Sequence, residues 1–303
     1  MSKLSAASLF RKLMTDRAYH RGKWEDRKFR YKFLLRCVLH PLTTRQYFRA
    51  LCELDEFERL LEASPTLPAK MQRPYLHRGG CIRERARAVL DHYHHVQGLP
   101  EDVRRLVCVY RESLLAVCEG RSGEQLTVTC SPCGFDREGE LMLILRFNGT
   151  VITRISFAFI RYQGKRTLFI AGLQGAARGK GPEVIRRATK ACHGLFPRRL
   201  LCEAVSVIAE ICAVESVVAV SEHNHVLRQL RYFWRKRGRF VARYSECWAS
   251  VGGVPAGGFW HLPAVLPRKA AEHIPARKRA EYRKRNGLLD HVRQEIKHRA
   301  GMV

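Results

Sequence analysis

Hydrophobic positions in the first 120 residues recur at the spacing of amphipathic helices. The clearest stretches are 31–39, 44–61 and 82–96, with breaks at Pro41, Pro65, Pro68 and Pro74. Apolar residues three and four positions apart form one buried stripe on a helix. The pattern predicts an all-helical N-terminal region.

From residue 126 the pattern becomes that of strands. Residues 126–130, 141–147, 151–160 and 167–171 are rich in β-branched and aromatic side chains. Asn148-Gly149, between the second and third of these runs, is a two-residue hairpin signal. We expect several consecutive antiparallel strands.

The remaining pattern alternates helices and strands. Helices are expected from the glycine-rich stretch after residue 171 to near His193-Gly194, and over 200–213, 226–237 and 276–300; strands are expected at 216–220, 240–244 and 259–262. Residues 216–220 are apolar throughout, as in a strand buried on both faces. The prediction is an α+β fold, with a mainly antiparallel mixed sheet and one crossover.

The pattern divides the chain into three regions. Residues 1–120 are predicted to be a basic helical region and 121–265 an α+β domain. Residues 266–303 are predicted to be a basic C-terminal helix that packs on the core through Leu288, Val292 and Ile296.

The charge balance points to an acidic partner. The formal net charge is +27, from 55 Lys and Arg against 28 Asp and Glu. Residues 1–50 contribute +10 and residues 264–303 contribute +7. An acyl carrier protein, an anionic membrane surface, another protein or nucleic acid would suit this charge, although solvated helix faces would also explain it.

The cysteines and the apolar segments indicate a cytoplasmic protein. Eleven cysteines are scattered singly, unlike a secreted disulfide framework. The first twenty residues lack the continuous apolar core of a signal peptide. The most apolar segment, 200–220, is interrupted by Glu203, Glu210 and Glu215, so membrane association is expected to be peripheral, at the inner membrane.

The stretch GLQGAARGKGPEVIRRATK, residues 172–190, is a candidate phosphate site. Glycines let a backbone approach a ligand, and a helix start offers unpaired amide hydrogens. The candidate cofactor-binding residues are Gln174, Gly175, Arg178, Gly179, Lys180 and Gly181. The spacing fits neither a Walker loop nor the dinucleotide fingerprint. Alternatively, the glycines merely shape an exposed connection.

The order of elements is similar to that of acyl-CoA-dependent N-acyltransferases. Their turn is Gln/Arg-x-x-Gly-x-Gly/Ala, whereas the frame from Gln174 has Ala177 at the first glycine. The resemblance implies an N-acyltransferase-like fold for residues 121–265 more than it implies cofactor binding; the donor expected with such a fold is coenzyme A or the phosphopantetheine of an acyl carrier protein.

A second polar group follows the expected strand at 216–220. Glu222, His223 and His225 are candidates for a general base or for holding a substrate, because residues after a central strand tend to face a cleft. Alternatively, Ser221 or Asn224 caps a helix and the histidines lie on the surface.

Three further motifs favour structural roles. Cys130-Ser-Pro-Cys133 lacks two further ligands at zinc spacing, so no metal is predicted, and no cysteine stands out as a nucleophile. The cluster His92-Tyr-His-His95 is expected on a helix surface. Residues 231–239 interleave aromatic and basic side chains as a nucleic-acid site would, although a core face with a basic outer side explains them better.

Several dispersed segments together resemble the VirK/YbjX family of Gram-negative bacterial proteins, over roughly residues 25–297. They are 169–175 (FIAGLQG), 193–198 (HGLFPR), 218–221 (VAVS) with His225, Val226 and Arg228, 244–253 (YSECWASVGG) and 278–283 (KRAEYR). The resemblance implies a link to virulence, cell-envelope integrity and tolerance of antimicrobial peptides, and carries over no catalytic residue.

These observations lead to one functional hypothesis and two alternatives. The hypothesis is a cytoplasmic, envelope-related factor that transfers an acyl group from a coenzyme A or carrier-protein donor to an amine. The first alternative is a non-catalytic adaptor on an anionic membrane or a protein partner. The second is a nucleic-acid-binding protein, disfavoured because no nucleic-acid-binding motif accompanies the charge.

Overall fold

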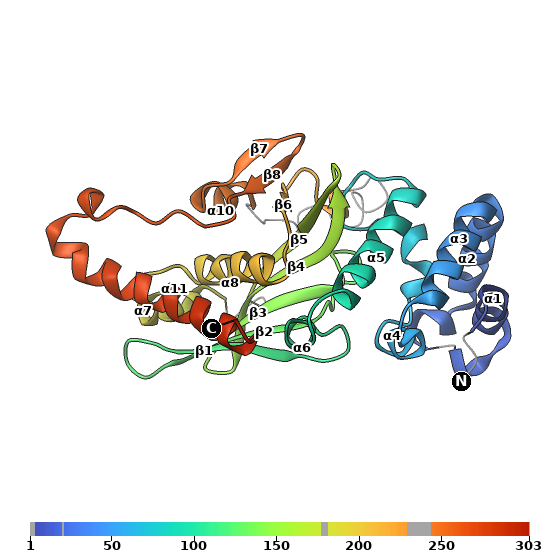
Figure 1. Cartoon of the computed structure of the whole chain (residues 1–303), viewed down its shortest axis with the longest axis horizontal. Coiled ribbons are helices and arrows are strands. Elements are labelled where there is room, and N and C mark those ends of the chain that lie inside the picture. Colours follow the sequence, from blue (N-terminus) through green and yellow to red (C-terminus); the bar gives the residue numbers. More distant parts are fainter. Residues whose placement is uncertain (1–3, 20, 177–180, 229–243, 303) are drawn as a thin grey trace.

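The computed structural model describes residues 4–19, 21–176, 181–228 and 244–302 (Figure 1). The N-terminal helices gather at one end of an elongated molecule, the sheet lies in the middle, and α7 and α11 lie toward the other end (Figure 1). Residues 177–180 and 229–243 lie outside the described part, so the predicted helix over 226–237 is described only at Val226–Arg228, which form a 3-10 turn.

The predicted helical character of the N-terminal region is confirmed over most of its length. The described helices here are α1 (Ala6–Thr15), α2 (Arg27–Leu39), α3 (Pro41–Glu53), α4 (Phe57–Ala63), α5 (Ile82–Gln97) and α6 (Glu101–Leu106). Pro41 occupies the first turn of α3, where its missing N–H costs nothing. The stretch 44–61 is two helices because Glu56 adopts a left-handed conformation (φ 50°) between them.

Eight strands among the described residues form one mixed sheet, which confirms the α+β prediction. The strands are β1 (Ser113–Glu119), β2 (Gln125–Pro132), β3 (Leu141–Phe147), β4 (Thr150–Tyr162), β5 (Lys165–Gly175), β6 (Ser216–Val220), β7 (Val254–Ala256) and β8 (Phe259–Leu262), in the order β1-β2-β3-β4-β5-β6-β8-β7. β5 and β6 are parallel and the other neighbours antiparallel. Asn148 and Gly149 make the predicted hairpin turn, with φ of 45° and 76°.

Two expectations about strands are wrong. β1 lies at 113–119, inside the region predicted to be helical; its apolar residues pair with β2 and pack against the C-terminal helix, so tertiary contacts decide its conformation. Tyr244 begins the helix α10 (Tyr244–Ser250) and does not end a strand. The predicted strand residues 240–243 lie outside the described part.

Helices cover the sheet. α7 (Gly181–Ala191) is followed by α8 (Pro197–Ile211), which packs on β3 and β4. The predicted C-terminal helix is confirmed as α11 (Arg279–Arg299), which packs on α8 and β1. Because α5 also packs on β4, the centre of that strand is buried on both faces.

The buried Glu140 and the partly buried Asp136 tie the helical region to the sheet. Glu140 accepts hydrogen bonds from three side chains of that region: Lys70 Nζ at 2.6 Å, the Tyr75 hydroxyl at 2.7 Å and the Tyr93 hydroxyl at 2.6 Å. Asp136 pairs with Arg73 and, at 3.0 Å, with Lys23 Nζ. A carboxylate with several donors tolerates burial, so the two regions are joined by specific bonds as well as by packing.

Candidate functional site

The strands β5 and β6 run side by side in parallel and separate at their carboxyl ends. The parallel pairing runs only from Thr167↔Ser216 to Ile170↔Ala219. On its other side β5 carries a bulge, because Ser156 pairs with Gly172 whereas Phe157 pairs with Ile170. β5 then continues to Gly175 beside β4, which leaves its edge toward β6 to other groups.

Glu138 lies at this divergence and joins two residues that the sequence placed in separate candidate sites. Its side chain is buried; Oε2 accepts a hydrogen bond from Gln174 Nε2, and Oε1 lies 3.3 Å from His225 Nε2. A side chain at Gly172 would overlap Glu138 Oε2, so glycine makes the room for this carboxylate. Gln174 Oε1 is buried without a hydrogen-bond partner among the described residues.

His225 is held on two sides. Its Nδ1 accepts a hydrogen bond from the Leu227 amide at 3.2 Å, so the neutral ring carries its proton on Nε2, toward Glu138. Its backbone bridges to His77, in the loop before α5, and its ring contacts Tyr244 at 5.6 Å between centroids. With Nδ1 engaged, His225 is better suited to positioning Glu138 than to acting as the base itself.

Tyr244, at the start of α10, contacts β5 just beyond the point where β5 and β6 separate. It is buried, and its hydroxyl oxygen accepts a hydrogen bond from the Leu173 amide of β5. Burial raises the pKa of Tyr244, and the negative charge of Glu138 raises it further. The phenol therefore stays protonated and can donate a hydrogen bond within the site.

Glu222 belongs to a neighbouring network. Its carboxylate accepts hydrogen bonds from the Ser245 amide at 3.1 Å and the Ser245 hydroxyl at 2.6 Å, and Trp260 Nε1 donates to that hydroxyl at 3.2 Å. Burial would raise the pKa of Glu222, but the Ser245 hydrogen bonds outweigh it and the pKa is lowered. A carboxylate that stays charged suits a cationic substrate group better than it suits a general base. His223 is exposed beside it.

The glycine-rich turn joins β5 to α7. Gly175 ends β5 and Gly181 begins the helix, whereas Arg178, Gly179 and Lys180 lie outside the described residues. Arg198, on α8, approaches the turn: a Cβ at Gly175 would lie 3.8 Å from its Nη2. The described part of the turn thus carries a helix start and a nearby cation, which together favour an anion.

A thiol pair joins α8 and α10. Cys247 of α10 is hydrogen-bonded to Cys202 of α8, and this bond lowers the pKa of Cys247 although burial opposes it; Arg198 and Arg199 act in the same direction as the bond. Lowered pKa and partial exposure are the marks of a reactive thiol. Sequence analysis singled out no cysteine, because Cys247 gains these properties only from other elements.

Sequence reasoning missed Glu138, Tyr244 and Arg198 as members of the site. Glu138 lies outside every motif, and Arg198 and Tyr244 stand in segments that carry the family resemblance without indicating a site. The loop before β3, the start of α10 and the start of α8 meet only in the folded chain. The expectation for His92 was wrong. Its ring is fully buried, Nδ1 accepts a hydrogen bond from the Phe159 amide at 3.2 Å, and it stacks on Phe159 because α5 covers β4.

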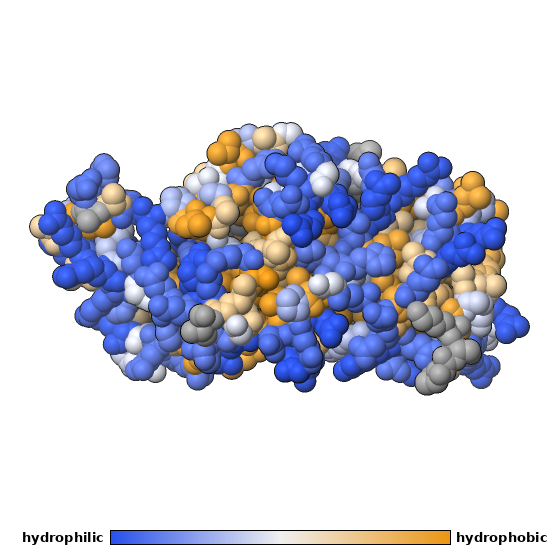
Figure 2. Space-filling model, viewed as in Figure 1, coloured by the Kyte–Doolittle hydropathy of each residue, from blue (hydrophilic) through white to orange (hydrophobic). Residues whose placement is uncertain are grey.

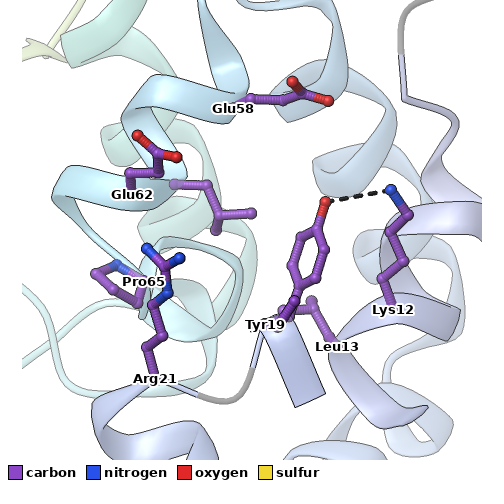
Figure 3. Close-up of a pocket in the computed structure, with 9 residues that line it drawn as sticks. Lys12, Leu13, Tyr19, Arg21, Glu58, Glu62 and Pro65 are labelled. Carbon is purple, nitrogen blue, oxygen red and sulfur yellow. Dashed lines mark hydrogen bonds between the residues drawn. The ribbon is translucent and has the colours of Figure 1, made fainter. Parts of the chain in front are cut away.

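Other hollows and clusters offer less chemistry. Figure 3 shows a hollow of about 340 Å³ in the helical region, where Lys12 Nζ donates to the Tyr19 hydroxyl at 3.3 Å. Its acidic residues Glu58 and Glu62 are exposed, so it holds no desolvated acid or base. Among the described residues no three His, Cys, Asp or Glu side chains gather as metal ligands, and no helix is long and apolar enough to cross a bilayer.

The described chain thus has an α+β fold, and its mixed sheet carries a cluster of buried polar side chains where the parallel strands β5 and β6 separate. The chain belongs to the VirK/YbjX family: the family model described as "Protein of unknown function (DUF535)" matches residues 22–298. A protein of Escherichia coli K12, "Uncharacterized protein YbjX", is 37% identical over 297 residues, which cover 97% of this chain and 90% of that protein. An "Uncharacterized protein" of Haemophilus influenzae is 31% identical over 141 residues, 46% of each chain. No solved structure matches the chain.

Proposed function

We propose that the protein binds a phosphate-bearing acyl donor where β5 and β6 diverge and transfers the acyl group to an amine. The donor would be coenzyme A or the phosphopantetheine of an acyl carrier protein. The observation that carries the proposal is the course of β5, which leaves its parallel partner, passes the bulge and leads directly into the glycine-rich turn and α7. The resemblance of the sequence pattern to N-acyltransferases also supports the proposal.

The edge of β5 supplies the contacts for an extended donor. The Leu173 amide donates to the Tyr244 hydroxyl, and Gly175 faces the same way because alternate residues of a strand share an edge, so Gly175 offers its backbone groups to a donor. An extended chain can bind to such backbone groups as an added strand would. The start of α7 and Arg198 would then hold the phosphates, and the thioester would supply the activated acyl group.

The two carboxylates suit different tasks toward an amine. Glu222, kept charged by Ser245, would bind the acceptor in its ammonium form. Glu138, held by Gln174 and His225, would receive the proton that the amine must lose before attack. His223, exposed at the rim beside Glu222, is the remaining candidate for contact with the acceptor.

The transfer forms one bond and breaks one. The bound ammonium would give one proton to Glu138 before attack. The acyl carbon would then gain a bond to the amine nitrogen and lose its bond to sulfur, and the nitrogen's second proton would pass through water to the departing sulfur. Tyr244, which stays protonated, would stabilise that sulfur by a hydrogen bond. His225 would keep the Glu138 carboxylate oriented throughout.

The biological setting belongs to the same proposal. The VirK/YbjX resemblance implies roles in cell-envelope integrity, virulence and antimicrobial-peptide tolerance, so the amine would belong to an envelope component or its precursor. The reaction would take place in the cytoplasm, where both donors occur. The net charge of +27 would favour an acidic carrier protein as partner.

Titration calorimetry of the full chain with coenzyme A, an acyl-coenzyme A and an acyl carrier protein tests the proposal. Saturable binding is expected, weakened about tenfold or more in Arg198→Ala because a phosphate contact is lost. Arg187→Ala, which removes an exposed cation from α7, is the matched control and should bind normally. Absence of binding, or equal weakening in both variants, would refute the donor site and leave the adaptor and nucleic-acid alternatives.

A further inference from the structure

One face of the N-terminal helices is apolar and has no partner in the described chain. Along α2 and into α3 the exposed side chains are Tyr31, Leu34, Leu35, Val38, Leu39 and Leu42. Val38 is 68% exposed and Leu42 70%. Tyr31, Leu35 and Val38 are spaced as one stripe on α2, and Leu42 extends the exposed apolar surface at the start of α3, beyond the non-helical residue His40. Figure 2 shows hydrophobic surface at this end of the molecule.

An open apolar groove adjoins the stripe. It has a volume of about 790 Å³ and lies between α1, α2 and α3, with Phe10, Val38 and Phe48 in its walls. The stripe and groove are continuous through Leu34 and Val38. Apolar surface of this extent on a soluble chain marks an interaction site.

The polar surroundings of this face are uniformly basic. Residues 27–49 contain seven Lys and Arg and no Asp or Glu. Arg27, Lys28, Lys32, Arg45 and Arg49 are exposed. Arg45 and Arg49 also line the groove, so cations stand directly beside the apolar surface.

We propose that the face of α2 and α3 docks on the surface of a membrane rich in anionic phospholipid. A helix with an apolar stripe and flanking cations lies in the plane of the bilayer interface, where side chains enter the acyl region and the cations meet headgroups. The groove would receive part of an acyl chain. A second copy of this chain would set seven cations against seven, which disfavours self-association through this face.

This inference stands apart from the acyl-transfer proposal. Its residues belong to α1, α2 and α3, whereas the donor site belongs to β5, α7, α8 and α10. Either can fail without the other, because vesicle binding and donor binding are separate measurements on the same full-length protein.

Vesicle co-sedimentation tests the proposal. The full chain is mixed with vesicles of phosphatidylglycerol and phosphatidylcholine, or of phosphatidylcholine alone, at about 0.1 M and about 1 M salt. The variant Val38→Ser/Leu42→Ser shortens the stripe without changing charge, with Val254→Ser/Val265→Ser as its control at exposed positions elsewhere. Arg45→Gln/Arg49→Gln removes two local cations, and Arg83→Gln/Arg87→Gln removes two exposed cations of α5 as its control.

We expect binding to the anionic vesicles at lower salt, with a loss of about tenfold or more in each test variant and less than about twofold in each control. Equal losses in test and control variants would mean a diffuse charge effect and would overturn the proposal. So would absence of vesicle binding. A dimer in sedimentation velocity that Val38→Ser/Leu42→Ser dissociates would identify the face as a protein interface instead.

Discussion

Glu138 Oε1 lies 3.3 Å from His225 Nε2, although Glu138 precedes and His225 follows the crossover that joins the parallel strands β5 and β6. The same carboxylate accepts a hydrogen bond from Gln174. A residue suggested by the glycine-rich turn and a residue suggested by the polar group after β6 therefore meet at one buried acid. This contact makes the two separate sequence motifs a single candidate site.

A double-mutant cycle tests whether glycine at position 172 leaves the space that the Glu138 carboxylate occupies. Gly172→Ala should destabilise the protein by about 1–3 kcal/mol, because its methyl group would overlap the Glu138 carboxylate. In a Glu138→Ala background the same change should cost less, because the overlap with the carboxylate is gone and Gln174, no longer hydrogen-bonded to Glu138, can move away from the added methyl group. The free energy of unfolding in urea measures both costs. Equal costs in the two backgrounds would show that Glu138 does not occupy this space.

The Lys70–Glu140 pair should matter far more than an exposed pair. Lys70→Met leaves a buried carboxylate without its cation and should cost about 3–5 kcal/mol of unfolding free energy. Arg59→Met removes the cation of the exposed pair with Glu56 and should cost less than about 1 kcal/mol. Urea unfolding of both variants checks the contrast, and a small loss in Lys70→Met would contradict the buried bond.

His92 should make stability fall in acid. Burial lowers its pKa in the folded protein, and the positive charges of Lys70 and His95 add to this. As pH falls below about 6.5 the unfolded chain takes up a proton that the native ring does not, so unfolding free energy drops by at most about 1.4 kcal/mol per pH unit.

The comparison that isolates this contribution uses His92→Gln. Between about pH 6.5 and pH 5 the variant should lose less stability than the wild type. Parallel curves for His92→Gln and the wild type would mean that His92 titrates alike in both states.

Cys247 should remain reactive at lower pH than it would without Cys202. The bond from Cys202 lowers the pKa of Cys247, so Cys202→Ala should move the pH profile of its alkylation by iodoacetamide to higher pH. Peptide mass spectrometry follows the site, and Cys212→Ala, which removes another buried thiol, is the control. An unchanged profile in Cys202→Ala would remove the basis for regarding Cys247 as activated.

Local patterns predicted the fold where they were long or strongly periodic. The helices of 82–96 and 276–300, the strands of the meander and the Asn148-Gly149 turn follow from side-chain spacing and backbone preference. β1 was missed because its short apolar run is compatible with either state until it pairs with β2.

The site was less accessible to sequence reasoning. Gln174 could be chosen because it belongs to the glycine-rich stretch, and His225 because it follows a strand, but nothing local shows that both reach Glu138. That meeting depends on the bulge in β5, on the small size of Gly172 and on the parallel register of β5 and β6. Tyr244 was assigned to a strand, which hid its contact with β5 where β5 and β6 separate.

Amide hydrogen exchange tests the central claim most directly, because it locates a bound donor on the chain. With coenzyme A present, the account predicts slower exchange in peptides covering the end of β5, 172–176, and the start of α7, 181–184, and unchanged exchange in α11. Unchanged exchange at both segments, or protection confined to other elements, would contradict a donor site at the divergence of β5 and β6.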